Sequence, residues 1–216
     1  MPEAISVQLE AGPDRVWACA LDWPGWTRSG KDADRALAAL AGAAPRYGRA
    51  VAAAGFSLPD QPGTSFVILH TSRGTGSSAF APMVPAAQEY EPATAAQARR
   101  RGALVAAAWA ELDRIAARAP AELRKGPRGG GRDRDGVVRH VLAAEAAYLR
   151  KLGVKLVQPA VGDEPAIAVF RAGALRVLQT PSDGSPLLEN GWPVRYAARR
   201  IAWHVLDHAW EIEDKG

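Results

Sequence analysis

A stretch rich in glycine, serine and proline divides this chain into two parts with different hydrophobic periodicity. It runs from Gly74 to Pro92, reads GTGSSAFAPMVPAAQEYEP, and has no sustained apolar repeat. Such a composition is typical of a linker, and we expect this one to lie along the surface. The chain is therefore predicted to form two units, residues 1–85 and residues 91–216.

The first unit combines short alternating segments with helical ones. AISVQLE and RVWACALD alternate apolar and polar residues on either side of a Gly-Pro-Asp turn, which predicts a β-hairpin. DADRALAALAGAAPRYGRAVAAAGF has a helical composition broken at Pro45, and TSFVILHTS is again typical of a strand. The order β-β-α-β predicts a small sheet with a helix on one face.

The second unit has the apolar spacing of four helices. Thr94, with a glutamine three residues later, has capping-box spacing before the first helix, and Asp133 or Asp135 can cap the second. A third helix is expected over residues 164–178, and Pro193 suits the first turn of the last. The predicted fold class is α+β: a small N-terminal α/β sheet unit followed by a C-terminal four-helix bundle.

Composition narrows the class of protein further. The single cysteine, Cys19, excludes an intramolecular disulfide, and no segment is long and apolar enough to span a membrane. The first residues, MPEAISVQLE, lack the basic and apolar regions of a secretory signal. These features predict a cytoplasmic protein. The formal net charge of +4 is gathered in short basic runs that keep loops solvated, so nucleic-acid binding is not the expected function.

Two of the four histidines, His204 and His208, stand four residues apart in the last predicted helix. On a helical wheel they lie between the apolar face and a charged strip, and their rings are neighbours. His140 in the second helix is the candidate third ligand, since a bundle can bring the two helix faces together. Three neutral imidazoles suit Zn²⁺, Ni²⁺ or Fe²⁺ and leave positions open for water or substrate. The pattern is also compatible with core packing and ion pairing.

Other polar side chains lie near these histidines in the predicted helices. Arg200 belongs to the charged strip of the last helix. Candidates for moving protons are Glu211, Asp207 and Glu145, and candidates for stabilising an oxyanion are Tyr148 and Arg195.

A glycine-rich basic loop, KGPRGGGRDRDG, precedes the second helix of this unit. It holds Arg128, Arg132 and Arg134, and the amino end of a helix attracts anions. These arginines are candidates for holding an anionic ligand near His140. The alternative is a solvated connection without a ligand.

Two segments of the second unit resemble a known family. DRDGVVRHVLAAEAAYLRKLG is similar to a second helix carrying a histidine, and WPVRYAARRIAWHVLDHAWEIED to a last helix carrying H-x-x-x-H, in the DinB-like superfamily. This superfamily of four-helix proteins includes the mycothiol-dependent maleylpyruvate isomerases. The resemblance covers roughly residues 91–216 and implies that His140, His204 and His208 form a metal triad. It also implies a thiol-dependent transferase or isomerase, or else a hydrolase, that uses a divalent metal, a small-molecule substrate and a low-molecular-weight thiol.

The segment VWACALDWPGWTRSGKDADRALAAL resembles the HicB-like domain in its strand, its Trp-Pro-Gly turn and the helix that follows. This resemblance implies a unit that binds a protein partner, which makes a noncatalytic interaction or regulatory protein the alternative function. Trp23 and Trp26 of the turn are expected to pack against the bundle, and Cys19 to be a buried small residue. An apolar stripe of the last helix is expected to bury against this unit or against a second subunit of a homodimer; it consists of Trp203, Leu206 and Trp210.

Overall fold

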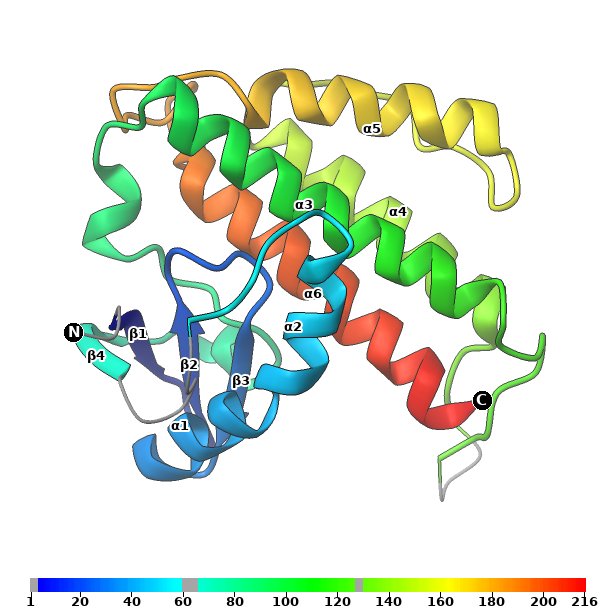
Figure 1. The fold of residues 1–216 in the computed structure, drawn as a ribbon, viewed down its shortest axis with the longest axis horizontal. Coiled ribbons are helices and arrows are strands. Elements are labelled where there is room, and N and C mark those ends of the chain that lie inside the picture. The colour runs from blue at the N-terminus through cyan, green and yellow to red at the C-terminus, as the bar shows by residue number, and fades with distance from the viewer. Residues whose placement is uncertain (1–3, 60–65, 127–129) are drawn as a thin grey trace.

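The computed structural model describes residues 4–59, 66–126 and 130–216, in which a four-stranded sheet is followed by a set of long helices (Figure 1). The strands are β1 Ile5–Ala11, β2 Val16–Ala20, β3 Thr27–Gly30 and β4 Phe66–Arg73, in the spatial order β3-β2-β1-β4. β1 and β2 are antiparallel, which confirms the predicted hairpin, and β4 pairs with β1 in parallel. The chain crosses between β3 and β4 through helices α1 (Ala33–Gly42) and α2 (Ala44–Ala52).

The sheet contains one strand more than the predicted β-β-α-β order. The extra strand β3 has the sequence TRSG, which carries no apolar alternation, but its backbone pairs with β2 in register from Val16 opposite Gly30 to Cys19 opposite Thr27. Pairing with a formed neighbour overrides a weak strand preference. The helical break predicted at Pro45 is confirmed, because Pro45 lies in the first turn of the second helix.

The two faces of β1 have different surroundings because side chains alternate along a strand. Val7 and Leu9 belong to the main apolar core. Gln8 and Glu10 are also buried, and they point to the opposite face, where Gln8 bonds to Ser72 and Glu10 accepts from Ser78 and from the backbone of Val84. The sheet is thus covered on both faces. The second face combines these polar groups with the apolar side chains of Trp17 and Cys19, which lie opposite Glu10 and Gln8 on β2.

The Trp-Pro-Gly turn contacts the bundle through Trp23 and Gly25, as expected for Trp23, but Trp26 packs within the sheet unit and not against the bundle. Trp26 is fully buried and stacks on Tyr47 of α2 with ring centroids 5.5 Å apart. Gly25 has a φ of +99°, and a Cβ there would lie 2.8 Å from Leu206 Cδ1, so glycine is required for both conformation and close packing. The guanidinium carbon Cζ of Arg100 lies 4.4 Å from the centre of the Trp23 ring.

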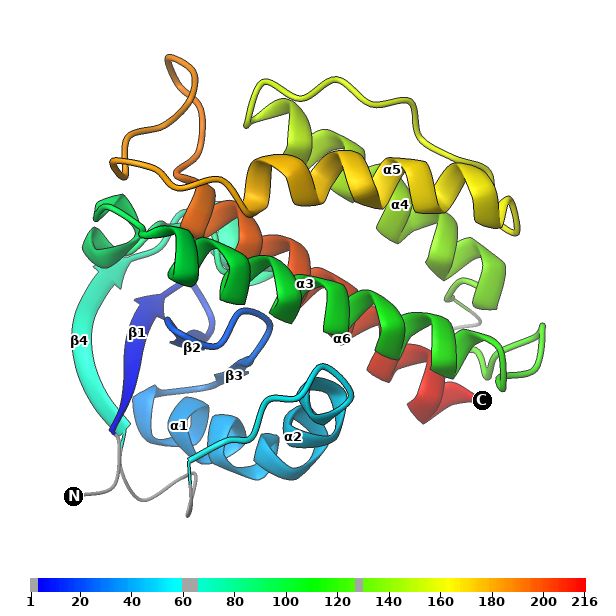
Figure 2. The same cartoon turned by 45° about the horizontal axis from the view of Figure 1, so that its top comes forward.

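The four helices expected in the second half are all present: α3 Ala95–Ala116, α4 Arg134–Arg150, α5 Glu164–Leu178 and α6 Val194–Lys215. Thr94 and Gln97 form the predicted capping box of α3, and Asp133 occupies the N-cap position of α4. The long helices α3 and α6 lie beside the sheet unit, and α4 and α5 lie on their far side (Figures 1 and 2). α6 therefore contacts both the sheet unit and α4.

The linker is more buried than the sequence suggested. It forms two short 3-10 helices, η1 (Gly76–Ala79) and η2 (Ala87–Tyr90), and Ser78 and Glu89 within them are buried. Trp17 of β2 donates to the carbonyl of Ser78 at 2.7 Å, and Arg199 of α6 pairs with Glu89. The linker therefore lies between the sheet and α6, since its polar groups satisfy buried partners on both.

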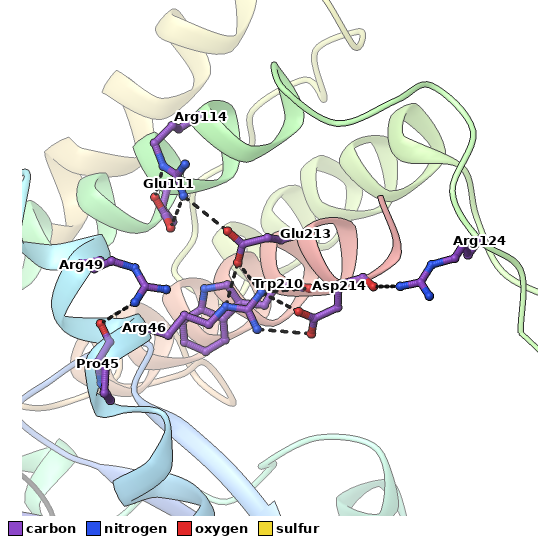
Figure 3. Close-up of polar contacts among 9 residues, drawn as sticks. All are labelled: Pro45, Arg46, Arg49, Glu111, Arg114, Arg124, Trp210, Glu213 and Asp214. Atoms are coloured by element: carbon purple, nitrogen blue, oxygen red, sulfur yellow. Dashed lines mark hydrogen bonds and ion pairs between the residues drawn. The ribbon is translucent and has the colours of Figure 1, made fainter.

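The apolar stripe of α6 buries against the sheet unit, one of the two outcomes expected for it. Trp203 packs edge-on against Trp17 with centroids 5.3 Å apart, in a cluster with Cys19. Trp210 lies under the guanidinium of Arg46, which bonds Glu213 at 2.9 Å and also reaches Asp214 (Figure 3). Burial raises the pKa of the Cys19 thiol, as befits a buried small residue.

Candidate metal centre

Three histidine rings meet where α4 crosses α6. His140 of α4 and His204 of α6 have their Nε2 atoms 3.3 Å apart, and the ring of His208 lies 4.5 Å from that of His204 and 4.9 Å from that of His140. One nitrogen from each ring can be chosen so that all three atoms lie within 4.8 Å of one another. The structure therefore brings together the three histidines that the spacing and the family resemblance singled out.

The separations suit a single cation with modest adjustment. Zinc bound tetrahedrally at about 2.0–2.1 Å has neighbouring ligand atoms about 3.3–3.4 Å apart. The 3.3 Å separation of His140 and His204 already has this value. The longest separation of up to 4.8 Å would have to shorten by at most about 1.5 Å, a movement within reach of a ring that is only partly buried, such as that of His208. The nitrogen donor set fits zinc, nickel or ferrous iron.

The surroundings keep two of the three imidazoles neutral. Burial, then the neighbouring His208 and His140 and the charges of Arg200 and Arg132, lowers the pKa of His204 to about 2. Burial and the proximity of His208 and Arg132 also lower the pKa of His140. A neutral imidazole has a free lone pair, which is the form that binds a metal ion.

The ring of His208 is oriented by a carboxylate. Its Nδ1 lies 2.7 Å from Oε2 of Glu211, and Oε1 of Glu211 accepts from Lys215 at 2.6 Å. Burial raises the pKa of Glu211, but the hydrogen bonds from Lys215 and His208 lower it by more. Its pKa is therefore below the ordinary value, and the side chain is a carboxylate. Nδ1 of His208 therefore carries a proton, which leaves Nε2 as the ring atom that would bind a metal ion. This is the arrangement that orients histidine ligands in metal sites.

Tyr148 and Arg200 border the cluster on the side of His204. The Tyr148 ring lies edge-on to His204 with centroids 5.8 Å apart, and its hydroxyl accepts from Nη2 of Arg200 at 2.9 Å. Burial raises the pKa of Tyr148, so its hydroxyl keeps its proton. Arg200 was visible in the sequence only as part of the charged strip; its position four residues before His204 was the signal that it shares the histidine face.

Three of the other candidate side chains have partners elsewhere. Burial raises the pKa of Glu145 to about 7, and this side chain bonds Trp109 of α3. Asp207 pairs with Arg28 at 3.4 Å, and burial raises its pKa. Arg195 donates to the carbonyl of Gln88 at 2.9 Å. The roles suggested for them at the histidine cluster therefore lack support from these contacts.

The arginines of the basic loop have separate positions. Arg134 donates to the carbonyl of Ala119 at 3.1 Å and pairs with Asp135. Arg132 lies near enough to the cluster for its charge to lower the pKa of His140 and of His204. Arg128 lies outside the described residues. Of the two described, only Arg132 is placed to act on a ligand at the histidines.

Comparison with protein-family models, with curated proteins and with solved structures found no match to this chain. Within the described residues, no helix combines the length and the apolar character that crossing a membrane requires. The site must therefore be interpreted from its own geometry and chemistry.

The neutral state of His204 predicts that acid destabilises the metal-free protein. The folded protein keeps His204 unprotonated down to about pH 2, whereas the unfolded chain binds a proton below the ordinary value of 6.5. The unfolded state therefore binds more protons, and the free energy of unfolding falls as the pH drops below 6.5. From pH 7 to pH 5 we expect a loss of about 2 kcal/mol from this residue.

Urea unfolding at both pH values, with a chelator present, measures this loss. His204→Gln should remove most of the pH dependence of unfolding that is due to His204. The smaller pH dependence due to His140 should remain. An unchanged pH dependence in that variant would contradict the assignment.

Proposed function

We propose that this protein binds a divalent metal ion through His140, His204 and His208 and uses it to catalyse a reaction of a small molecule. The observation that carries the proposal is the convergence of three imidazole rings from two helices, with ligand atoms within 4.8 Å of one another. Buried ring nitrogens need partners, and one metal ion would be a partner shared by all three rings. Here two of the rings face each other through Nε2.

The reaction class proposed is the transfer or isomerisation of a substrate with the help of a thiol. A divalent cation held by three neutral imidazoles supplies an open position at which a thiol or a water becomes more acidic. Glu211 fixes the orientation of His208 and can share its proton. The Tyr148 hydroxyl, protonated and next to His204, can donate a hydrogen bond to a developing negative charge. The resemblance to DinB-like proteins favours the thiol over water.

Elemental analysis of protein purified without chelators tests the metal. We expect about one Zn, Ni or Fe per chain, and about the same stoichiometry when metal-free protein is titrated with Zn²⁺ or Co²⁺. Protein loaded with the metal it prefers is then screened with low-molecular-weight thiols and electrophilic small molecules. A chain that neither retains nor takes up metal would rule out the proposal.

A second candidate function is protein binding through the sheet unit. The observation that favours it is the outer strand β4, on which Val67, Ile68 and Leu69 are each more than 40% exposed. An exposed apolar edge strand is a template for pairing with another chain, and a second copy of this protein is the simplest partner. A dimer detected by sedimentation that is lost in Ile68→Lys but kept without the three histidines would support this candidate.

A further inference from the structure

Two adjacent arginines of α6 are both buried, but in the described part of the chain only one of them has a carboxylate partner. Arg199 is 1% exposed, and its guanidinium bonds both oxygens of Glu89. Arg200 is 4% exposed, and within the described ranges of the chain no aspartate or glutamate forms an ion pair with it. A buried charge without a counter-ion is unfavourable for folding. The position of Arg200 therefore calls for an explanation that Arg199 does not need.

The contacts of Arg200 hold its guanidinium in place and leave donors free. Its Cζ atom lies 5.1 Å from the centre of the Tyr148 ring and 4.8 Å from that of Trp203, and Nη2 donates to the Tyr148 hydroxyl. Nε and Nη1 are buried and have no acceptor among the residues that the structure describes. Ring contacts compensate part of the charge but supply no hydrogen-bond acceptor.

His204 offers a third donor of the same kind. Its Nδ1 is also buried, with no acceptor in the described part of the chain. When Nε2 faces the cluster with its lone pair, the proton must be on Nδ1. Arg200 and His204 are one helical turn apart on α6 and so are neighbours. Beside the three-histidine cluster, the protein thus presents donors and positive charge without the matching acceptors.

We propose that Arg200 recognises a carboxylate group of the small molecule that binds at the three-histidine cluster. A carboxylate has only acceptor atoms and carries the single negative charge that balances one guanidinium. A phosphate dianion would bring a second charge that Arg200 does not balance. Arg132, whose charge also acts on His140 and His204, adds a longer-range attraction for such anions.

This inference rests on the proposed function, because it assumes that the three-histidine cluster binds a small molecule. It names the substrate or thiol class as carboxylate-bearing. It also assigns Arg200 a role in binding rather than in folding. Replacing a buried unpaired charge by an apolar side chain of similar length is neutral or stabilising, whereas removing a structural arginine lowers the free energy of unfolding.

The test uses two probes that differ only in the carboxylate. Thioglycolate and its neutral amide, 2-mercaptoacetamide, are titrated into the full-length protein, both metal-free and loaded with Co²⁺, and binding is measured by calorimetry. We expect the wild type to prefer thioglycolate by about 10- to 100-fold, the range of a charge-assisted hydrogen bond. Arg200→Met should reduce this preference to near unity without lowering the midpoint of urea unfolding.

Two further variants and one further probe complete the experiment. Arg195→Met, on the same helix with its guanidinium on Gln88, should keep the wild-type preference. Arg200→Lys, which keeps the charge without the guanidinium, should retain part of it and serves as the test if Arg200→Met does not fold.

An absent preference in the wild type, or an unchanged one in Arg200→Met, would overturn the inference, and so would tighter binding of inorganic phosphate than of thioglycolate. If Co²⁺ does not bind, the proposed function fails, and the preference measured in metal-free protein still decides the role of Arg200.

Discussion

His140→Ala is expected to lower the affinity for Zn²⁺ by more than about 100-fold, since loss of a hydrogen bond to a ligand alone costs 10- to 100-fold and this change removes a ligand. His140 is the only member of the triad on α4, so its loss leaves two rings one turn apart on α6. Two imidazoles seldom suffice to hold a divalent ion. Competition with a chromophoric chelator measures the affinity.

Two further variants distinguish the loss of a metal ligand from changes around the ligands. Glu211→Gln keeps all three rings but weakens the hydrogen bond to His208, and we expect a loss of about 10- to 100-fold. His70→Ala removes a histidine from β4, outside the cluster, and should leave the affinity unchanged. Urea unfolding of the metal-free variants checks that each remains folded. Wild-type affinity in a folded His140→Ala would show that the cluster is not a metal site.

Glu89→Ala is expected to lower the free energy of unfolding by about 3–5 kcal/mol, the cost of leaving one member of a buried ion pair without its partner. Glu89 is 3% exposed and accepts from Arg199 at 2.7 and 2.8 Å. Glu89 holds the pKa of Arg199 above its ordinary value against the opposing effect of burial. Urea unfolding measures the change.

The matched control for this pair lies two residues further along the linker. Glu91 lies 3.6 Å from Arg195, and both side chains are accessible to solvent. Glu91→Ala should therefore change the free energy of unfolding by at most about 1 kcal/mol. The double replacement of Glu89 by Leu and Arg199 by Met should recover much of the loss, because it removes both charges. Equal effects of Glu89→Ala and Glu91→Ala would contradict the importance of the buried pair.

Several local features could be predicted because they depend on neighbours in the sequence. The hairpin, the break at Pro45, the capping box at Thr94 and the helix over residues 164–178 all follow from turn residues, caps and periodicity. The strand β3 could not be predicted in the same way. Its four residues become a strand only through pairing with β2.

The candidate site also has features that the sequence predicted and features that it did not. The spacing of His204 and His208 made their rings neighbours on any helix, since 3.6 residues per turn places positions four apart on one face. His140 was the candidate third ligand because a bundle can bring two helix faces together, and the family resemblance pointed to the same residue; the structure brings its ring to the other two. Glu145 shares α4 with His140, but its side chain lies toward α3 and bonds Trp109. Membership of the same helix therefore did not place both residues at the site.

Sequence alone determined where helices and strands could form and which histidines shared a face, because these depend on backbone geometry over a few residues. Tertiary structure decided which faces meet. The rotation and crossing of α4 against α6 place His140 at His204. The path of the linker gives Arg199 its carboxylate, whereas Arg200 has none among the residues that the structure describes. The physical reason is that such pairings join residues far apart in the chain, and their geometry is set by the packing of whole elements against one another.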